Sequence, residues 1–133
     1  MTEKEKYIKA AFKNYNDNKK RLQSISYESL HAIDYTKQRT KTSRATTGNK
    51  RLLNYIDLKQ KLEKQIELVE RVLWFYQLEN LGKDEYIIQR YFKGKLLYRV
   101  AMDINLSEST LHNWERDIRE TAARCADCFG LWY

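Results

Sequence analysis

The first apolar pattern of the chain has helical spacing and begins near the N-terminus. Steps of four, three and seven residues separate Ile8, Phe12, Tyr15 and Leu22, as on the buried stripe of an amphipathic helix. The stretch TEKE matches a capping box, in which the Thr2 hydroxyl and the Glu5 carboxylate satisfy exposed backbone amides. The pattern predicts a helix that begins at Thr2. It leaves open whether this helix continues or breaks near residues 24–26, where Ser26 could cap a second short helix.

The second apolar pattern lies in the middle of the chain and repeats on alternating steps of three and four residues. Lys59 and Asn80 are its polar exceptions, and its apolar members are Leu52, Tyr55, Leu62, Ile66, Val69, Leu73 and Tyr76. Over about four heptads this pattern predicts a long helix, residues 50–82, which Gly82 ends. This apolar stripe, the seam of the long helix, can pack on the N-terminal helix as a hairpin. It can instead pack on the same helix of a second copy, as a coiled coil in a homodimer through residues 50–81. The pattern does not separate the two.

The stretch between these patterns is polar and basic. From Tyr35 to Ile56 no residue is acidic, whereas the basic ones are Lys37, Arg39, Lys41, Arg44, Lys50 and Arg51. Too little apolar surface is available to offset the entropy of ordering, so we expect a basic flexible connector. It is either a solvated linker or an arm whose Lys41 and Arg44 touch DNA phosphates. The chain thus divides into an N-terminal helical segment, the connector, the long helix and a C-terminal unit: 1–34, 35–49, 50–82 and 83–133.

The C-terminal unit is predicted to form three helices in quick succession. The first, residues 83–92, opens with two acidic side chains where a helix N-terminus favours negative charge, and a Lys-Gly pair ends it. Residues 96–103 form the second helix. Ser107 caps the third, which reaches about Cys128.

The junction between the second and third of these helices has the spacing of a helix-turn-helix, two helices joined at a steep angle by about three residues. Ala101 supplies the small side chain where the helices come closest, and Asn105 tolerates the left-handed backbone that the turn needs. The apolar filling between the helices and the domain behind them is Val100, Ile104, Leu106, Leu111 and Trp114. With the Ser107 cap, these residues predict a helix-turn-helix; two core helices of an ordinary bundle are the alternative.

In a helix-turn-helix, the second helix enters the major groove of double-stranded DNA and its N-terminal outer face meets base edges. The predicted base-contacting residues are Glu108, Ser109, His112, Asn113 and Arg116. Asn113 can pair with adenine, Arg116 with guanine, and Glu108 can accept from a cytosine amino group. The predicted phosphate contacts here are Lys93, Lys95, Arg99 and Arg119. The alternative for all of them is a solvated polar surface.

Composition supports an all-α fold, and its positive charge leaves open either a polyanionic partner or solvated lysines on helix faces. The chain has no Pro and only four Gly in 133 residues, so little interrupts its helices. Its formal charge is +7, but residues 83–124 hold 8 basic and 7 acidic side chains, against 17 and 10 in residues 1–82. The predicted helix-turn-helix unit is therefore almost neutral. A second copy, the connector or a partner protein must supply further attraction for DNA.

Two absences from the sequence bear on location. No run of 18 apolar residues exists, so we expect no membrane span. The stretch MTEKEKYIKA lacks the apolar core of a signal peptide. We therefore expect a cytoplasmic protein.

The segment YFKGKLLYRVAMDINLSESTLHNWERDIRETA resembles region 4 of sigma-70-type factors, in which RYF, a Gly, an Ala-containing helix, LS-ST and a recognition helix occur in this order. The layout more closely resembles small phage late-transcription regulators of the ArpU and RinA type. This resemblance covers residues 86–124 and the rest only in layout. It implies an activator of phage or prophage late genes in a bacterial host cell, with host RNA polymerase as a further partner. Val100 departs from the acidic residue that sigma factors carry before the Ala, and no promoter-melting segment is present.

Other motifs are weaker candidates for chemistry. The CADC motif, residues 125–128, lacks the further ligands of a zinc site, and its cysteines are expected to pack as small apolar residues. The terminal FGLWY is expected to fold back on the core through Gly130, with an interaction surface as the alternative. We expect no enzyme activity, metal or cofactor. Two other functions stay open: a small terminase-like DNA-packaging component, and a coiled-coil interaction protein that does not bind DNA.

Overall fold

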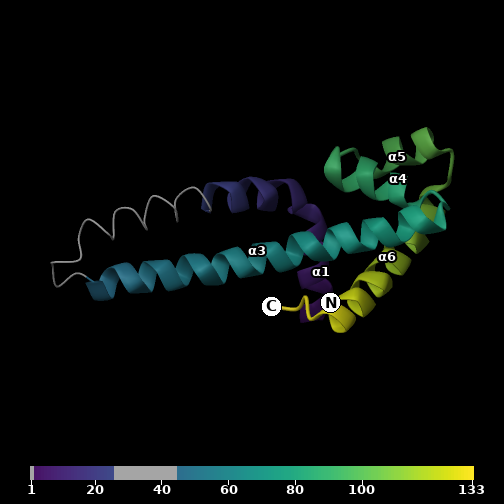
Figure 1. Ribbon diagram of the computed structural model, residues 1–133. Helices are drawn as coiled ribbons and strands as arrows, with labels where there is room; N and C mark the ends of the chain where they lie inside the picture. The colour runs from purple at the N-terminus through teal and green to yellow at the C-terminus, as the bar shows by residue number, and fades with distance from the viewer. Residues whose placement is uncertain (1, 26–44) are drawn as a thin grey trace.

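The computed structural model describes residues 2–25 and 45–133, and all regular secondary structure in these ranges is helical (Figure 1). The predicted all-α fold is confirmed. The long helix α3 is the axis of the molecule, and α1 and α6 contact it and each other. Residues 15–25 are also helical. The remaining bounds, in chain order, are α1 Glu3–Lys13, α3 Ala45–Glu79, α4 Lys83–Ile87, the π-helix η1 Ile88–Phe92, α5 Leu97–Ile104 and α6 Glu108–Phe129.

Helix α1 begins as the sequence predicts. The Glu5 backbone N–H donates to Thr2 Oγ1 at 3.2 Å, and the Thr2 N–H donates to Glu5 Oε2 at 3.4 Å. These are the reciprocal bonds of a capping box. Ile8 and Phe12, each 2% exposed, then face the core.

The end of α1 differs from both expected alternatives. The helix breaks at Asn14, and the helical segment 15–25 continues in another direction (Figure 1). At this break the Tyr15 ring stacks on Phe92, with 4.4 Å between ring centroids. Tertiary packing of this kind can outweigh local helix propensity. The apolar spacing within one segment does not record contacts with distant segments.

Helix α3 begins earlier than the sequence pattern indicates. It starts at Ala45, so residues 45–49 of the predicted connector are helical. Extending an existing helix needs no new nucleation, which offsets the poor helix propensity of Thr and Gly there. The rest of the connector, with the predicted phosphate contacts Lys41 and Arg44, lies outside the described residues, as does the predicted cap Ser26.

The end of α3 is set by Asn80 rather than by Gly82. The helix ends at Glu79, and Asn80 adopts a left-handed φ of 54° while its N–H donates to the Tyr76 carbonyl at 3.1 Å. Asn accepts this conformation more readily than most residues because its short polar side chain can bond locally. Gly82, with φ of 94°, instead stands at the start of α4.

The buried face of α3 is wider than the predicted seam. Seam members Leu62, Ile66, Val69 and Tyr76 are buried, and so are Gln65, Leu68 and Val72 outside it. Helix α3 contacts α1, α4 and α6, so more than one of its sides is covered, which a two-helix seam does not require. Packing within the chain against α1, α4 and α6 together, rather than a two-helix hairpin alone, thus buries this part of α3.

The first helix of the C-terminal unit departs from a regular α-helix. After α4 the chain widens into the π-helix η1, and Gly94, with φ of 68°, follows it as the predicted terminator. Such π-turns are often found where packing or function requires a local adjustment. Here the Tyr91 ring of η1 packs against Phe12 of α1, with 5.4 Å between centroids.

The C-terminus folds back on the core, as predicted. Gly130 has φ of 63° at the reversal, and Leu131 beyond it is buried. The Tyr7 hydroxyl donates to the Leu131 carbonyl at 2.7 Å, and the Trp132 ring lies 5.6 Å from the Tyr7 ring. These contacts join the two ends of the described chain.

The two cysteines of the CADC motif differ in environment. Cys125 is half-buried, and burial raises the pKa of its thiol, whereas Cys128 is exposed. The expectation that both pack as apolar residues is therefore wrong for Cys128, because the last turn of α6 meets solvent at that position. In residues 2–25 and 45–133, no three His, Cys, Asp or Glu side chains gather as a metal site would need. Among the helices of these same ranges, none has the length and apolar character to span a membrane.

We predict that Phe12→Ala lowers the free energy of unfolding by about 3–5 kcal/mol, because the lost ring leaves a cavity in the core. Chemical denaturation followed by circular dichroism measures this change. The control is Met102→Ala, at a side chain that is 74% exposed, which should change stability by less than about 0.5 kcal/mol. Equal losses in the two variants would show that Phe12 is not a core residue.

Candidate nucleic-acid interface

The turn between α5 and α6 has the left-handed residue that the sequence predicts. Asn105 adopts φ of 64° and ψ of 44°, the left-handed conformation. The N–H groups of Asn105 and Leu106 both donate to the Ala101 carbonyl, the latter at 3.0 Å. Bonds of this type close a helix end tightly and let the chain change direction at once. Ala101, only 8% exposed, is the small side chain at the corner.

Helix α6 begins with the predicted side-chain cap. Ser107 Oγ accepts the Thr110 backbone N–H at 3.2 Å, and the two hydroxyl oxygens of these residues lie 2.9 Å apart. The cap satisfies one of the amides that a first helical turn leaves unpaired. The aligned peptide dipoles also give this end of α6 a partial positive charge, which favours a nearby phosphate.

The inner face of α6 is held by Leu111 and Trp114. Leu111 is fully buried, as is Val100 on α5, and both belong to the main core. The Trp114 ring lies over Gly82, where an added Cβ would be 3.4 Å from Trp114 Cη2. That distance is ordinary van der Waals contact, so it is the left-handed backbone, with φ of 94°, that favours Gly at position 82.

Tyr86 of α4 fixes α6 by a polar contact as well. Its side chain is fully buried, and its hydroxyl donates to Glu115 Oε1 at 2.6 Å. Burial raises the pKa of Tyr86, and the hydrogen bond to Glu115 raises it further, so the hydroxyl stays a donor at neutral pH. The Tyr86 ring also meets the Trp114 ring edge-on, with 6.3 Å between centroids.

The outer face of α6 is exposed, as the helix-turn-helix prediction requires. It carries all five predicted base-contacting residues: Glu108, Ser109, His112, Asn113 and Arg116. Among the described residues, their side chains make one polar contact, 3.9 Å between His112 Nδ1 and Glu115 Oε2. The structure therefore brings the five together on one surface, opposite Leu111 and Trp114, and leaves their polar groups available to a partner.

The predicted phosphate contacts do not form one set. Lys93 and Arg99 are exposed. Lys95 Nζ lies 2.9 Å from Asp103 Oδ2, a contact that lowers the pKa of Asp103 and neutralises much of the Lys95 charge. Arg119 is half-buried and lines a cavity rather than the exposed flank of α6. Lys93 and Arg99 are thus the better candidates.

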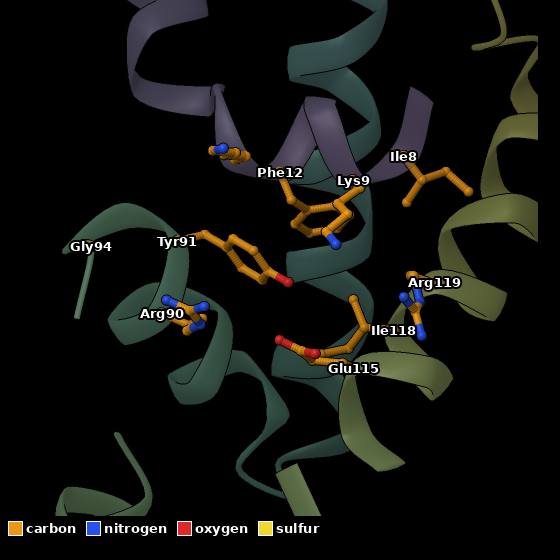
Figure 2. A pocket seen from close by; sticks show the side chains of 10 residues that line it. Ile8, Lys9, Phe12, Arg90, Tyr91, Gly94, Glu115, Ile118 and Arg119 are labelled. Carbon is orange, nitrogen blue, oxygen red and sulfur yellow. The ribbon is translucent and has the colours of Figure 1, made fainter. Parts of the chain in front are cut away.

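Three cations that the sequence did not single out line the same cavity as Arg119. They are Lys9 and Lys13 of α1 and Arg90 of η1 (Figure 2). Lys9 and Lys13 stand at the opposite end of the chain from Arg119, so no local pattern connects them. The four residues are brought together by the packing of α1 and η1 against α6.

No protein-family model, curated protein or solved structure matches this chain. The resemblance to phage late-transcription regulators of the ArpU and RinA type therefore stays a prediction that rests on residues 86–124. The geometry of residues 86–124 in the structure does not depend on this resemblance. They form a tight corner followed by a helix with one anchored and one exposed face.

We predict that Asn105→Val lowers the free energy of unfolding by about 1–2 kcal/mol, because a β-branched residue is strained at positive φ. Asn105→Gly should change it by less than about 1 kcal/mol, since Gly adopts this conformation freely. Thermal and chemical denaturation measure both variants. A Val variant as stable as the Gly variant would show that the corner does not need a left-handed residue.

Proposed function

We propose that this chain is a sequence-specific transcription regulator that binds double-stranded DNA and acts by binding rather than by catalysis. The observation that carries the proposal is the exposed outer face of α6 beside the corner at Asn105. The resemblance of residues 86–124 to phage late regulators supports an activator of phage or prophage late genes. Its place of action is then the cytoplasm of the bacterial host.

The chemistry of the outer face suits base edges. The major groove is about 12 Å wide and admits one helix, and Arg and Asn make bidentate bonds with guanine and adenine there. Asn113 and Arg116 are three residues apart, so they lie on neighbouring positions of one helix face. Because Leu111 and Trp114 anchor the opposite face, these side chains are carried by a rigid element, as specific recognition requires.

Helix α5 and its N-cap carry a second exposed surface, which is apolar. Leu96, Tyr98 and Met102 are all exposed there. Large apolar side chains that remain in solvent often mark a protein contact. We assign this surface to host RNA polymerase, the protein partner that the resemblance suggests.

A single copy has limited electrostatic attraction for DNA. Residues 83–124 carry 8 basic and 7 acidic side chains, and affinity for the phosphate backbone grows with each cation that contacts it. Two joined copies would contact two half-sites and bind far more tightly than either alone. The exposed face of α3 is the surface that suits a second copy.

An antiparallel pair of α3 helices is complementary in apolar surface, and it brings together the half-buried Lys64 and Glu67, of which Glu67 also pairs with Arg71 of its own chain at 2.8 Å. In the register that sets Lys64 opposite Glu67 of the second copy, the other facing pairs are Leu53 with Leu78 and Ile56 with Phe75. Leu53, Ile56, Phe75 and Leu78 are all exposed in the single chain. Each contact occurs twice about the two-fold axis, as an isologous interface requires.

The same register sets the distance between the two DNA-reading units. At 1.5 Å per residue, the C-terminal ends of the two α3 helices lie about 40 Å apart along their axis. Half-sites one turn of DNA apart are separated by about 34 Å. The separation of the α3 ends is thus of the same order as one turn of DNA, which supports a pair of α6 helices that reads two half-sites.

We predict that Asn113→Ala and Arg116→Ala each weaken binding to a preferred duplex by about 1–3 kcal/mol. The duplex is selected from a random-sequence library with the full chain, and affinity is measured by mobility shift at fixed salt. The matched control is Arg124→Ala, which removes the same charge from an exposed position farther along α6.

Two results would contradict the DNA-reading assignment. One is a library selection that enriches no sequence. The other is an equal loss of affinity in Arg116→Ala and Arg124→Ala, because the contact would then be electrostatic only.

We predict that the chain is a dimer in light scattering and that Lys64→Glu raises its dissociation constant about tenfold, since like charges then face each other. Glu67→Lys should act likewise, and the double exchange Lys64→Glu/Glu67→Lys should restore the dimer. Absence of rescue would rule out this register. A ring-sized mass would instead favour the DNA-packaging alternative.

A further inference from the structure

A cavity of about 380 Å³ lies between α1, η1 and α6, apart from the outer face of α6 (Figure 2). Ile8, Phe12 and Ile118 form apolar parts of its wall. Gly94, just after η1, lies at its edge and carries no side chain that would narrow it. Its volume falls in the range of about 300–1,000 Å³ that is typical of small-molecule sites.

The cavity has a large excess of positive charge. Lys9, Lys13, Arg90 and Arg119 line it, with Glu115 as the single acidic member of its lining. None of these four cations forms an ion pair with a carboxylate of the described residues. Glu115, whose Oε1 accepts the Tyr86 hydroxyl at 2.6 Å, offsets only one of these four positive charges.

The Arg90 side chain is held in place by one hydrogen bond of its guanidinium group. Its Nη1 donates to the Lys95 carbonyl at 2.9 Å, which fixes the guanidinium beside the Gly94 turn. Its Nε is buried and has no hydrogen-bond partner among the described residues. The other N–H groups of the guanidinium can still donate, and an anion is the best acceptor for them.

Tyr91 adds a neutral donor to this group. Figure 2 shows its hydroxyl and Lys9 Nζ directed into the same space, with Arg90 and Arg119 on either side of it in this view. Burial raises the pKa of Tyr91 to about 12, so the hydroxyl keeps its proton at neutral pH. The neighbouring Glu115 carboxylate also raises this pKa, so the Tyr91 hydroxyl lies beside both the cations and the one acidic group of the cavity.

We propose that this cavity binds a phosphate group through Arg90, Arg119, Lys9 and Lys13. Arginine guanidinium groups and lysine ammonium groups are the usual phosphate ligands in proteins. The group could belong to a free phosphorylated small molecule or to the DNA backbone beside α6, because both offer the same oxygen acceptors. In either case it ties α1 to α6, since each helix supplies part of the site.

The test uses the full chain and inorganic phosphate as the probe, followed by calorimetric titration. Saturable binding is expected for the parent chain. Lys9→Gln/Lys13→Gln should weaken it at least about tenfold, because two charge-assisted contacts are lost. The matched control, Lys6→Gln/Lys20→Gln, removes the same charge from exposed positions outside the cavity and should stay within about twofold. No saturable binding, or equal affinity in the two double variants, would overturn the proposal.

A second arm separates the two sources of phosphate. Duplex DNA is added to the phosphate-loaded chain: displacement of phosphate assigns the cavity to a DNA backbone group, and retention assigns it to a free ligand. Asn113→Ala/Arg116→Ala, which alters only the outer face of α6, should bind phosphate like the parent chain. A failure of the DNA-reading proposal and a failure of the cavity proposal would therefore give different results.

Discussion

The packing of α6 on α3 is the contact on which the outer face of α6 and the cationic cavity both depend. Ile118, Ala122 and Ala126 of α6 are buried, and the two alanines let the helices approach closely. The Tyr76 hydroxyl of α3 donates to the Asp117 carbonyl at 3.2 Å and lies 2.7 Å from Thr121 Oγ1. Because α6 continues without interruption from its exposed first turns into this buried half, the core contact also sets the direction of the outer face.

Helix α6 separates two polar surfaces that differ in depth. Arg116 stands on the outer face in solvent, whereas Arg119, three residues later, lines the cationic cavity. Glu115 lines the same cavity as Arg119, and its Oε1 accepts the Tyr86 hydroxyl. This arrangement holds the carboxylate of Glu115 at a fixed position. It also suits each surface to a different task, since an open helix face fits a groove and a walled cavity fits a single anionic group.

Sequence reasoning succeeded where a single residue decides the local backbone. The capping box at Thr2, the left-handed Asn105 and the Ser107 cap were all predicted from residue type and spacing. The residues of the outer face follow from that corner and from helical periodicity alone. The same reasoning placed the first break ten or more residues too late, because the stacking of Tyr15 on Phe92 leaves no periodic signal.

The amino-acid sequence by itself determined the all-α class, the helix caps and the turn before α6, because each depends on bonds among residues that are close together in the chain. Only the tertiary structure decided that α3 would be covered on several sides and that Lys9 would meet Arg119 across a cavity. Those features arise from packing between distant segments. Hydrophobic burial is non-directional, so a sequence pattern shows which face of a helix will be buried but not which other element covers it.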